Sequence, residues 1–385
     1  MAENKDKKVL NVPNLRFPEF EGEWEKKRLG DFTERVKRKN KYNLSKLPLT
    51  ISAKYGLVDQ ITFFNKIVAS TDMSNYYLLK KGEFAYNKSY SNDYPWGAIK
   101  RLDNYEQGVL SALYICFTTQ DNIESDFILQ YFESPKWHKS VSEIAVEGAR
   151  NHGLLNISVQ DFFQTYHYVP KEKKEQTKIA TLLYLIDERI STQNKIIEKL
   201  ETLIKGIRND VFGKLRKSVG FNAMIGDVLS YEQPQSYLVE DTEYTNEGTP
   251  VLTANKAFVL GYTSEIEGIY DKGDCIIFDD FTLDCKYVDF SFKVKSSAIK
   301  ILTAKNKELL RYTFEFLKYL DLSTEEHKRH YITETQNQEF ILPTVQIVRT
   351  IAHAFYALSL WKETIVKQRY AFEKQKQYLL RQMFI

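Results

Sequence analysis

An internal repeat is the feature that most constrains what this 385-residue chain can fold into. Leu29-Gly30-Asp31-Phe32 recurs as Ile225-Gly226-Asp227-Val228, and Lys80-Lys81-Gly82-Glu83 recurs as Asp271-Lys272-Gly273-Asp274. Val169-Pro170 precedes one long helical pattern, and Leu342-Pro343 precedes a second. Each match is short, but their shared order predicts two related domains, each followed by a long helix.

Short apolar runs bounded by Gly, Asn and Asp predict the strands of both domains. We expect strands at 49–52, 83–87 and 113–118, and at 251–253, 275–278 and 298–302, with short helices near 126–132 and 309–320. The predicted fold class is α+β, with two similar strand-rich α/β domains separated by an antiparallel pair of long helices in a pseudo-twofold repeat. The expected segments are a flexible arm (1–14), the first domain (15–169), the central helix (170–217), the second domain (218–343) and the C-terminal helix (344–385).

The two long helices carry apolar residues at spacings of three and four, which is typical of a helix-pair seam. The seam residues are Leu183, Ile186, Ile190, Ile197, Leu200, Ile204 and Ile207 in the first helix, and Leu358, Ile365, Phe372 and Leu379 in the second. Lys362, Arg369 and Lys376 make the second stripe thinner. About 35 helical residues would form a rod of roughly 50 Å.

Composition and motifs exclude several classes of protein. Three cysteines without a C-x-x-C pair indicate a reducing cytoplasm, and neither a signal peptide nor a membrane-spanning run is recognisable. Phosphate-binding loops, methyl-donor sites and hydrolase motifs are missing from the sequence. One arrangement, Asp279 and Asp284 with Lys286, could position Mg²⁺ and a water for nuclease chemistry, and we keep it as an alternative.

Polar and basic loops that interleave aromatics are candidates for contacts with DNA bases and phosphates. In the first half the candidates are Lys54, Tyr55, Lys88, Ser89, Tyr90, Ser91, Trp96, Arg150, Asn151 and His152. In the second half they are Asn255, Lys256, Asp280, Thr282, Lys286, Lys328, Arg329 and His330. The net charge of +3 is unevenly distributed, because residues 218–343 hold 12 Lys/Arg and 21 Asp/Glu. We expect either that this acidity faces away from a duplex or that partner proteins supply much of the phosphate contact.

Motifs along almost the whole chain resemble one family. Trp24 to Asp31 and Phe221 to Asp227 open the two variable domains, and a Pro, a short charged link and an Ile-Ala pair follow each. Asn11-Val12-Pro13-Asn14-Leu15-Arg16-Phe17-Pro18-Glu19-Phe20, Asn87-Lys88-Ser89-Tyr90-Ser91 and Gly153-Leu154-Leu155-Asn156-Ile157-Ser158 are similar to patterned stretches of that family. It is the specificity subunit of Type I restriction-modification systems.

The resemblance implies a cytoplasmic, non-catalytic DNA-binding subunit. Each variable domain would be a target recognition domain that reads one half of a bipartite double-stranded DNA site. The long helices would space these domains and bind two methyltransferase subunits, and two restriction (translocase and nuclease) subunits would complete the assembly, away from any membrane. This chain would hold no cofactor; S-adenosylmethionine, ATP and Mg²⁺ would sit on the partners. A coiled-coil interaction protein without a DNA role is the other alternative.

Overall fold

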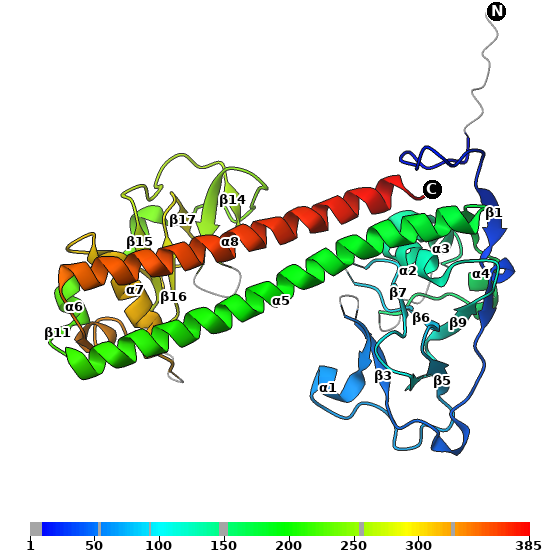
Figure 1. The fold of residues 1–385 in the computed structure, drawn as a ribbon, viewed down its shortest axis with the longest axis horizontal. Helices are drawn as coiled ribbons and strands as arrows, with labels where there is room; N and C mark the ends of the chain where they lie inside the picture. Colours follow the sequence, from blue (N-terminus) through cyan, green and yellow to red (C-terminus); the bar gives the residue numbers. More distant parts are fainter. Residues whose placement is uncertain (1–9, 53–54, 92–93, 146–152, 254–257, 325–327) are drawn as a thin grey trace, which may run out of the picture. The chain divides into compact units, whose positions relative to one another are not determined.

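A computed structural model describes residues 10–52, 55–91, 94–145, 153–253, 258–324 and 328–385. The chain forms two compact units (Figure 1). Unit 1 comprises residues 1–192 and 369–385, and unit 2 comprises residues 193–368. The two long helices α5 (Lys173–Ser218) and α8 (Val345–Gln382) each contribute one part to each unit.

The described part of unit 1 is built from short strands and, ahead of α5, four short α-helices. Its strands are β1 (Glu25–Arg28), β2 (Thr33–Arg35), β3 (Leu49–Ser52), β4 (Gly56–Asp59), β5 (Tyr77–Lys80), β6 (Phe84–Asn87), β7 (Ala98–Arg101), β8 (Gln107–Leu110), β9 (Ile115–Thr119) and β10 (Tyr166–Val169). Its helices ahead of α5 are α1 (Gln60–Phe64), α2 (Ser125–Glu133), α3 (His138–Ser142) and α4 (Val159–Gln164).

Unit 2 repeats this design with fewer strands. Its strands are β11 (Ala223–Met224), β12 (Leu229–Glu232), β13 (Thr249–Leu252), β14 (Val259–Thr263), β15 (Cys275–Asp279), β16 (Cys285–Val288), β17 (Lys293–Val294), β18 (Ile299–Ala304) and β19 (Glu339–Phe340). Its short helices are α6 (Ile225–Val228) and α7 (Leu309–Leu320). The six strands and two short helices expected from the sequence are all present, within a few residues of their predicted bounds.

The sheets show that the repeat extends to topology. Unit 1 contains an antiparallel four-stranded sheet in the order β2-β9-β6-β7, and unit 2 contains one in the order β12-β18-β15-β16. A two-stranded ladder joins the beginning and end of each domain, β1 with β10 and β11 with β19. The predicted pseudo-repeat of two strand-rich domains is therefore confirmed.

The repeated acidic residue of the Gly-Asp motif closes the same turn in both units. The Asp31 carboxylate accepts a hydrogen bond from the Arg28 backbone N–H at 2.8 Å, and Asp227 accepts one from the Met224 N–H at 2.8 Å. These backbone donors precede the first turn of a helix and have no partner within it, so the carboxylates satisfy them.

The repeated glycine of the same motif is required by a close backbone approach. A Cβ at Gly30 would lie 3.2 Å from the Phe163 carbonyl oxygen, and one at Gly226 would lie 3.1 Å from the Gln336 carbonyl oxygen. Both distances are tighter than ordinary van der Waals contact, and the obstructing atom is backbone, which cannot easily move. The motif recurs because the same packing recurs.

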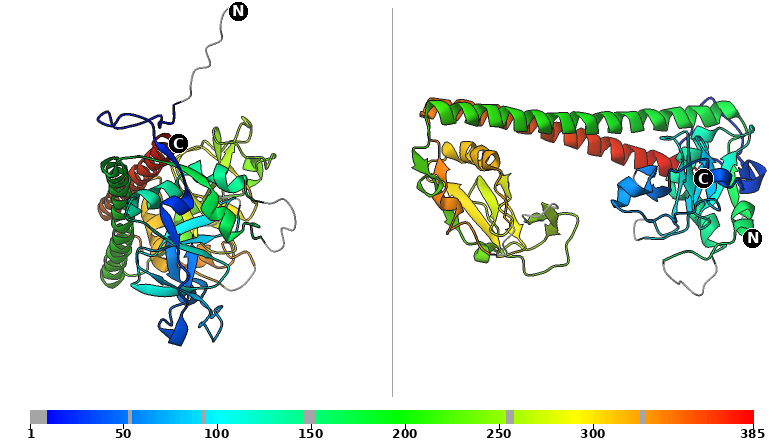
Figure 2. Two further views of the ribbon diagram at one scale, coloured as in Figure 1. Left: turned by 90° about the vertical axis from the view of Figure 1, so that its right-hand side faces the viewer. Right: turned by 90° about the horizontal axis from the view of Figure 1, so that it is seen from below.

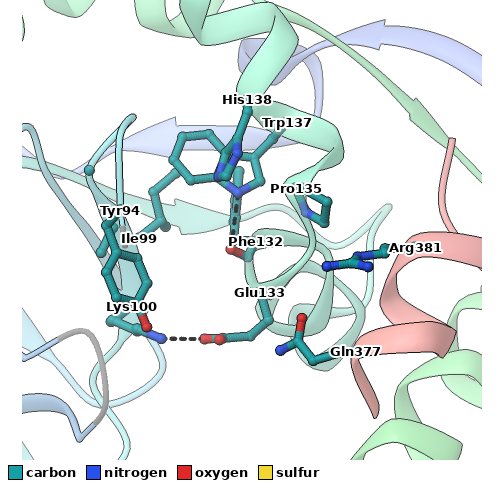
Figure 3. Close-up of a pocket in the computed structure, with 12 residues that line it drawn as sticks. Tyr94, Ile99, Lys100, Phe132, Glu133, Pro135, Trp137, His138, Gln377 and Arg381 are labelled. Atoms are coloured by element: carbon teal, nitrogen blue, oxygen red, sulfur yellow. Dashed lines mark hydrogen bonds and ion pairs between the residues drawn. The ribbon is translucent and has the colours of Figure 1, made fainter. Parts of the chain in front are cut away.

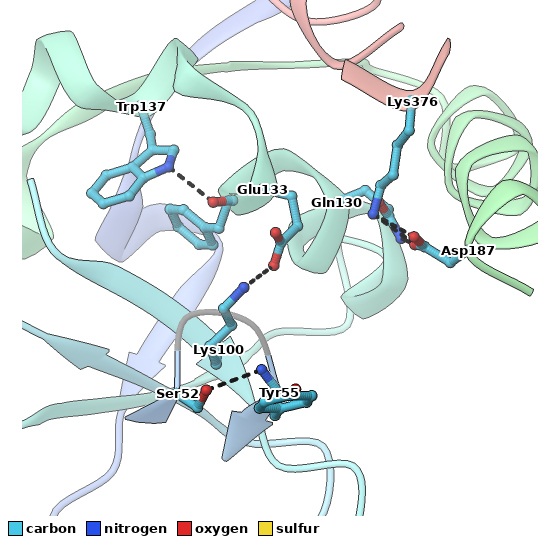
Figure 4. Close-up of polar contacts among 9 residues, drawn as sticks. Ser52, Tyr55, Lys100, Gln130, Glu133, Trp137, Asp187 and Lys376 are labelled. Carbon is cyan, nitrogen blue, oxygen red and sulfur yellow. Dashed lines mark hydrogen bonds and ion pairs between the residues drawn. The ribbon is translucent and has the colours of Figure 1, made fainter. Parts of the chain in front are cut away.

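Within unit 2 the long helices run antiparallel. Gln193 Nε2 donates to Gln368 Oε1 at 3.4 Å, Glu201 forms an ion pair with Lys362 at 2.6 Å, and the Arg208 guanidinium lies over the Phe355 ring. In unit 1 the early part of α5 packs against the late part of α8, where Lys376 contacts both oxygens of Asp187 at 2.7 Å (Figure 4). Lys362 and Lys376, which interrupt the apolar stripe of the second helix, therefore form ion pairs with acidic residues of α5.

All the predicted seam residues are buried or half-buried. The buried ones are Leu183, Ile186, Leu200, Ile365 and Leu379, and the half-buried ones are Ile190, Ile197, Ile204, Ile207, Leu358 and Phe372. Many of them belong to the hydrophobic cores of the two units rather than to an isolated two-helix interface. Because the short helices and sheets of the two units also cover the long helices, the apolar stripe of each long helix does not need to be a complete heptad repeat.

An equivalent short helix fills the space between the four-stranded sheet and the long helices in each unit. Phe127 and Tyr131 of α2 join the sheet residue Phe117 and the α5 residue Leu183 in one core (Figure 1). In unit 2, α7 occupies the corresponding position between the sheet and the long helices (Figure 2). Each domain is thereby fixed to its helix by a continuous apolar core.

A buried histidine makes unit 1 sensitive to acid. The His167 ring nitrogens lie 2.8 Å from the hydroxyls of Tyr131 and Thr165, and burial lowers the pKa of His167 to about 3. Because this lies below the ordinary value of 6.5, stability from neutral His167 is complete above pH 6.5 and is lost as the pH falls. We expect unit 1 to lose about 1.4 kcal/mol per pH unit below that point.

Urea unfolding followed by tryptophan fluorescence at pH values on either side of 6.5 would measure this loss. His167→Gln removes the titrating group while keeping polar atoms for the two hydroxyls, so it should weaken the pH dependence. An unchanged pH dependence in that variant would contradict the assignment to His167.

Two further features bear on the expected class of protein. Cys116, Cys275 and Cys285 are buried free thiols, and burial raises the pKa of each to about 12. Among the helices within the described ranges, none combines the length and the apolar character that crossing a membrane requires.

Candidate DNA interface

In unit 1 the structure brings two of the predicted DNA-reading loops together. The Tyr90 backbone N–H donates to the Gly153 carbonyl at 3.1 Å, and the Leu155 N–H donates to the Lys88 carbonyl at 2.9 Å. Ser89 forms an isolated bridge with Leu154 between these two bonds. Residues about 65 positions apart in the sequence therefore form one two-stranded surface beyond the end of β6.

The side chains of this two-stranded surface differ in their exposure to solvent and in their existing hydrogen bonds. Ser89, Ser91 and Tyr90 are exposed, Tyr90 at 37%. Lys88 is half-buried, and its ammonium donates to the Ile157 carbonyl at 3.3 Å. Trp96 packs partly against the core of unit 1, so its ring is more restricted than the other candidates.

The third loop of unit 1 is the turn between β3 and β4. The Tyr55 N–H donates to the Ser52 hydroxyl at 3.2 Å, which closes the turn (Figure 4). The Tyr55 ring is 60% exposed. An aromatic ring held at the tip of a hairpin is suited to contact a base or a sugar.

A hollow of about 360 Å³ lies within unit 1, next to the predicted DNA-reading loop between β6 and β7 (Figure 3). Tyr94 and Gly97 of the loop line one side, and Arg381 of α8 lines the opposite side. Lys100 and Glu133 form an ion pair of 2.5 Å inside it, and the Lys100 side chain is only 10% exposed (Figures 3 and 4). The positive charge of Lys100 is therefore already matched.

The ring of His138 also borders this hollow, beside Trp137. Burial lowers the pKa of His138, so this ring remains neutral at neutral pH. The Trp137 indole N–H donates to the Phe132 carbonyl at 3.0 Å (Figure 4). This wall of the hollow is thus uncharged and rigidly held.

Sequence reasoning did not connect Arg381 or Lys100 with the reading loops. Arg381 is 287 positions away from Tyr94, and both approach the same hollow only because the end of α8 packs into unit 1. No local pattern could reveal this proximity. Lys100 lies within the buried strand β7 and is itself 8% exposed, so the sequence around it has the pattern of a strand rather than that of a polar loop.

In unit 2 the corresponding loops also meet, but two predicted DNA-reading residues lie inside the protein. Asp280 is 1% exposed; its carboxylate accepts from the N–H groups of His330 and Tyr331 at 3.0 and 2.7 Å and lies 3.3 Å from Lys300. His330 is also 1% exposed, and its Nδ1 lies 2.9 Å from Glu334. We therefore do not retain Asp280 or His330 as base-reading residues, because their polar atoms hold the two loops together.

The remaining described candidates of unit 2 are more accessible. Thr282 and Arg329 are exposed, and so is Lys328, which forms an ion pair with Glu334 at 3.0 Å. The side chain of Lys286 is 34% exposed and contacts Asp284 at 2.8 Å. The described part of this surface is thus poorer in unmatched positive charge than the sequence suggested.

The residues of the nuclease alternative are engaged in other interactions. Asp279 Oδ1 accepts from the N–H groups of Phe281 and Thr282 at 2.8 and 3.0 Å, as in a capped turn. Burial alone would raise the pKa of Asp284, but Lys286 and Lys318, each at 2.8 Å, lower it more. Among the described residues no three His, Cys, Asp or Glu side chains gather as metal ligands would. The geometry gives the nuclease alternative no support.

Several predicted reading residues cannot be placed. Lys54, Arg150, Asn151, His152, Asn255 and Lys256 lie outside the described residues.

Comparisons with known proteins identify the fold. No protein-family model matches the chain. A segment of 126 residues is 45% identical to the specificity subunit of the Type I restriction enzyme EcoR124I/EcoR124II from Escherichia coli, covering 31% of this chain and 31% of that subunit. The crystal structure of a Type I restriction-modification S subunit from M. genitalium aligns with 97% of this chain and 99% of its own, at a TM-score of 0.63 and 15% identity.

The chain has the fold of a Type I specificity subunit. The resemblance inferred from the sequence is thereby confirmed, as is the α/β architecture with long helices. A second solved structure, from work on complex assembly and conformational transition of the type I restriction-modification system, aligns with 93% of this chain and 96% of its own, at a TM-score of 0.50 and 14% identity. The E. coli relative is matched over less than a third of its length, whereas the S-subunit fold extends over nearly the whole chain.

Proposed function

We propose that this protein is the sequence-specific DNA-binding subunit of a Type I restriction-modification complex, and that each of its two recognition domains reads one half of a bipartite site. The observation that carries the proposal is the duplicated four-stranded sheet, each copy presenting paired loops beyond β6 or β15. The 45% identical segment of a specificity subunit supports the same function.

The exposed loop residues would make the contacts with DNA. In the first domain these are Tyr55, Ser89, Tyr90 and Ser91, together with Lys54, Arg150, Asn151 and His152 from the sequence. In the second they are Thr282, Lys328 and Arg329, together with Asn255 and Lys256. Arg and Asn can pair with purine edges in the major groove, while Lys and Ser hold phosphates.

The long helices would space the two readers and provide the surface for two methyltransferase subunits. Two linked readers at a set separation make the second binding event intramolecular, so two short half-sites act as one long site. The partners, including two restriction subunits, would carry S-adenosylmethionine, ATP and Mg²⁺, and the complex would act in the cytoplasm without catalysis by this chain.

A domain exchange tests this proposal. Residues 15–169 are replaced by the first recognition domain of another specificity subunit, and adenine methylation is mapped across the host genome. We expect only one half of the methylated motif to change, because each domain reads its own half-site. A chain carrying the exchange in 218–343 is the matched control and should change the other half.

A motif altered in both halves would contradict the one-domain, one-half-site assignment. Unchanged methylation on deletion of the whole gene, together with no salt-dependent DNA binding, would favour an interaction protein without a DNA role.

A further inference from the structure

A strongly basic segment of unit 1 lies apart from the predicted reading loops. Residues 35–46, here called the basic loop, contain six Lys/Arg and no Asp or Glu. The topologically equivalent segment of unit 2, 231–242, contains three Asp/Glu and no Lys or Arg. The two segments follow the aligned Gly-Asp motifs and begin at the first strand of each four-stranded sheet, so the contrast is not produced by different positions in the fold.

Several cations of the basic loop are free to bind a ligand. Lys37, Lys41 and Lys46 are exposed, and within the described part of the chain their ammonium groups form no hydrogen bond or ion pair. Two other members serve the fold, since Arg38 pairs with Glu83 at 2.9 Å and Lys39 donates to the Asn75 carbonyl. The loop is therefore anchored and still carries unmatched positive charge.

The loop displays an aromatic ring between these lysines. Asn40 is fully buried; its amide donates to the Ser45 carbonyl at 2.9 Å and accepts from the Ser45 N–H at 3.0 Å, which closes the turn. Tyr42 and Asn43 both have left-handed backbone conformations, with φ of 62° and 51°. Such a conformation is uncommon for a bulky residue, and here it leaves the Tyr42 ring 93% exposed.

An exposed tyrosine flanked by free lysines, without any acid, matches the chemistry of nucleic-acid contacts. Lysines neutralise phosphates, and a tyrosine can contact the sugar-phosphate backbone of a duplex without sequence preference. An acidic protein surface would satisfy the lysines, but it gives no reason to hold a tyrosine in a strained and exposed position. The combination favours DNA.

We propose that the basic loop is a second, sequence-independent contact with double-stranded DNA, separate from the reading loops; this inference rests on the proposed function. The loop precedes β3, and the turn carrying Tyr55 follows it, so the two lie at opposite ends of that strand. About six extended residues separate Lys46 from Ser52, or roughly 20 Å. At about 3.4 Å per base pair, this corresponds to roughly six base pairs.

The basic loop would therefore hold phosphates outside the base pairs that the β3–β4 turn reads. The equivalent segment of unit 2, 231–242, has no Lys or Arg, so the flank of the first half-site would contribute more to the salt dependence of binding than the flank of the second.

The test uses the full-length chain and a fluorescently labelled random-sequence duplex of about 40 base pairs, with affinity measured by anisotropy over a range of salt concentrations. Lys41→Ala combined with Lys46→Ala should weaken binding roughly tenfold at low salt and reduce the slope of log K against log salt by about 1.8. Tyr42→Ala should weaken binding and leave the slope unchanged, since an uncharged contact with the DNA backbone releases no counterions.

Lys171→Ala combined with Lys174→Ala is the matched control, because it removes two exposed lysines of the same unit, one just ahead of α5 and one in its first turn. A slope unchanged in the Lys41/Lys46 variant, or reduced equally in the control, would overturn the inference and leave the proposed function intact. Absence of salt-dependent binding by the wild-type chain would overturn both.

Discussion

Replacing Phe384 by alanine is expected to lower the free energy of unfolding of unit 1 by about 3–5 kcal/mol. Phe384 is 1% exposed, and its ring contacts Trp24, Phe127 and Tyr131 at centroid distances of 5.5 to 6.5 Å. The side chain follows the end of α8, yet it packs in the hydrophobic core of unit 1. Its removal leaves a cavity among large aromatic rings that cannot easily close.

Tryptophan fluorescence offers a selective measurement, because Trp24, Trp96 and Trp137 all lie in unit 1 and the fourth tryptophan, Trp361, is 54% exposed in unit 2. Urea unfolding of Phe384→Ala should shift the fluorescence transition to lower denaturant.

Phe212 provides the matched variant, since it occupies the repeated position and packs against Tyr312, Phe316 and Tyr319 in unit 2. Phe212→Ala should leave the fluorescence transition nearly unchanged and increase hydrogen exchange in α7. Equal effects of both variants on the fluorescence transition would contradict independent cores in the two units.

Glu175→Ala is expected to destabilise unit 1 by a similar amount, about 3–5 kcal/mol. The Glu175 carboxylate has a side chain only 2% exposed and accepts hydrogen bonds from the Arg16 guanidinium at 2.8 Å and from the Trp24 indole at 3.1 Å. Alanine would leave the buried Trp24 indole N–H without its acceptor and the Arg16 guanidinium without its counter-charge, with only the Glu21 and Gly22 carbonyls as acceptors. The desolvation that the pair had offset would then oppose folding.

Glu106→Ala is the control for this variant, because Glu106 pairs with Lys81 at 2.9 Å where both side chains are more than half exposed. Solvent screens that pair, so its loss should cost less than about 1 kcal/mol. Urea unfolding of both variants measures the difference, and comparable losses would show that burial does not govern the Glu175 contact.

Both large effects link the fold to the proposed reading function. Residues 10–24 and 369–385 are far apart in the sequence, but both segments belong to unit 1. There the Leu15 N–H donates to the Gln382 carbonyl at 3.0 Å. We expect Phe384→Ala and Glu175→Ala to impair recognition of the first half-site and to spare the second.

Local patterns in the sequence were sufficient to predict six of the strands, two of the short helices, both long helices and the repetition of the domains. Strands such as β6 and β15 are apolar runs that end on Asn87 and Asp279, and α5 and α8 carry stripes with helical spacing. Backbone preference and hydrophobic periodicity act over a few residues, so they can be recognised without knowledge of the fold. The repeated Gly-Asp motif also has a local cause, because its carboxylate closes a turn three residues away.

Contacts between distant segments, in contrast, were decided by the tertiary structure. Asp280 and His330 have the composition of exposed polar loops, but they are buried because two loops 50 residues apart share one carboxylate. Arg381 lines the hollow beside Tyr94, and Phe384 fills the first core, only because the end of α8 packs into unit 1. The composition of the basic loop was visible in the sequence, whereas the exposure of Tyr42 depends on the buried Asn40 clamp. Burial and proximity depend on which distant surfaces exclude water from one another, and no short stretch of sequence contains that information.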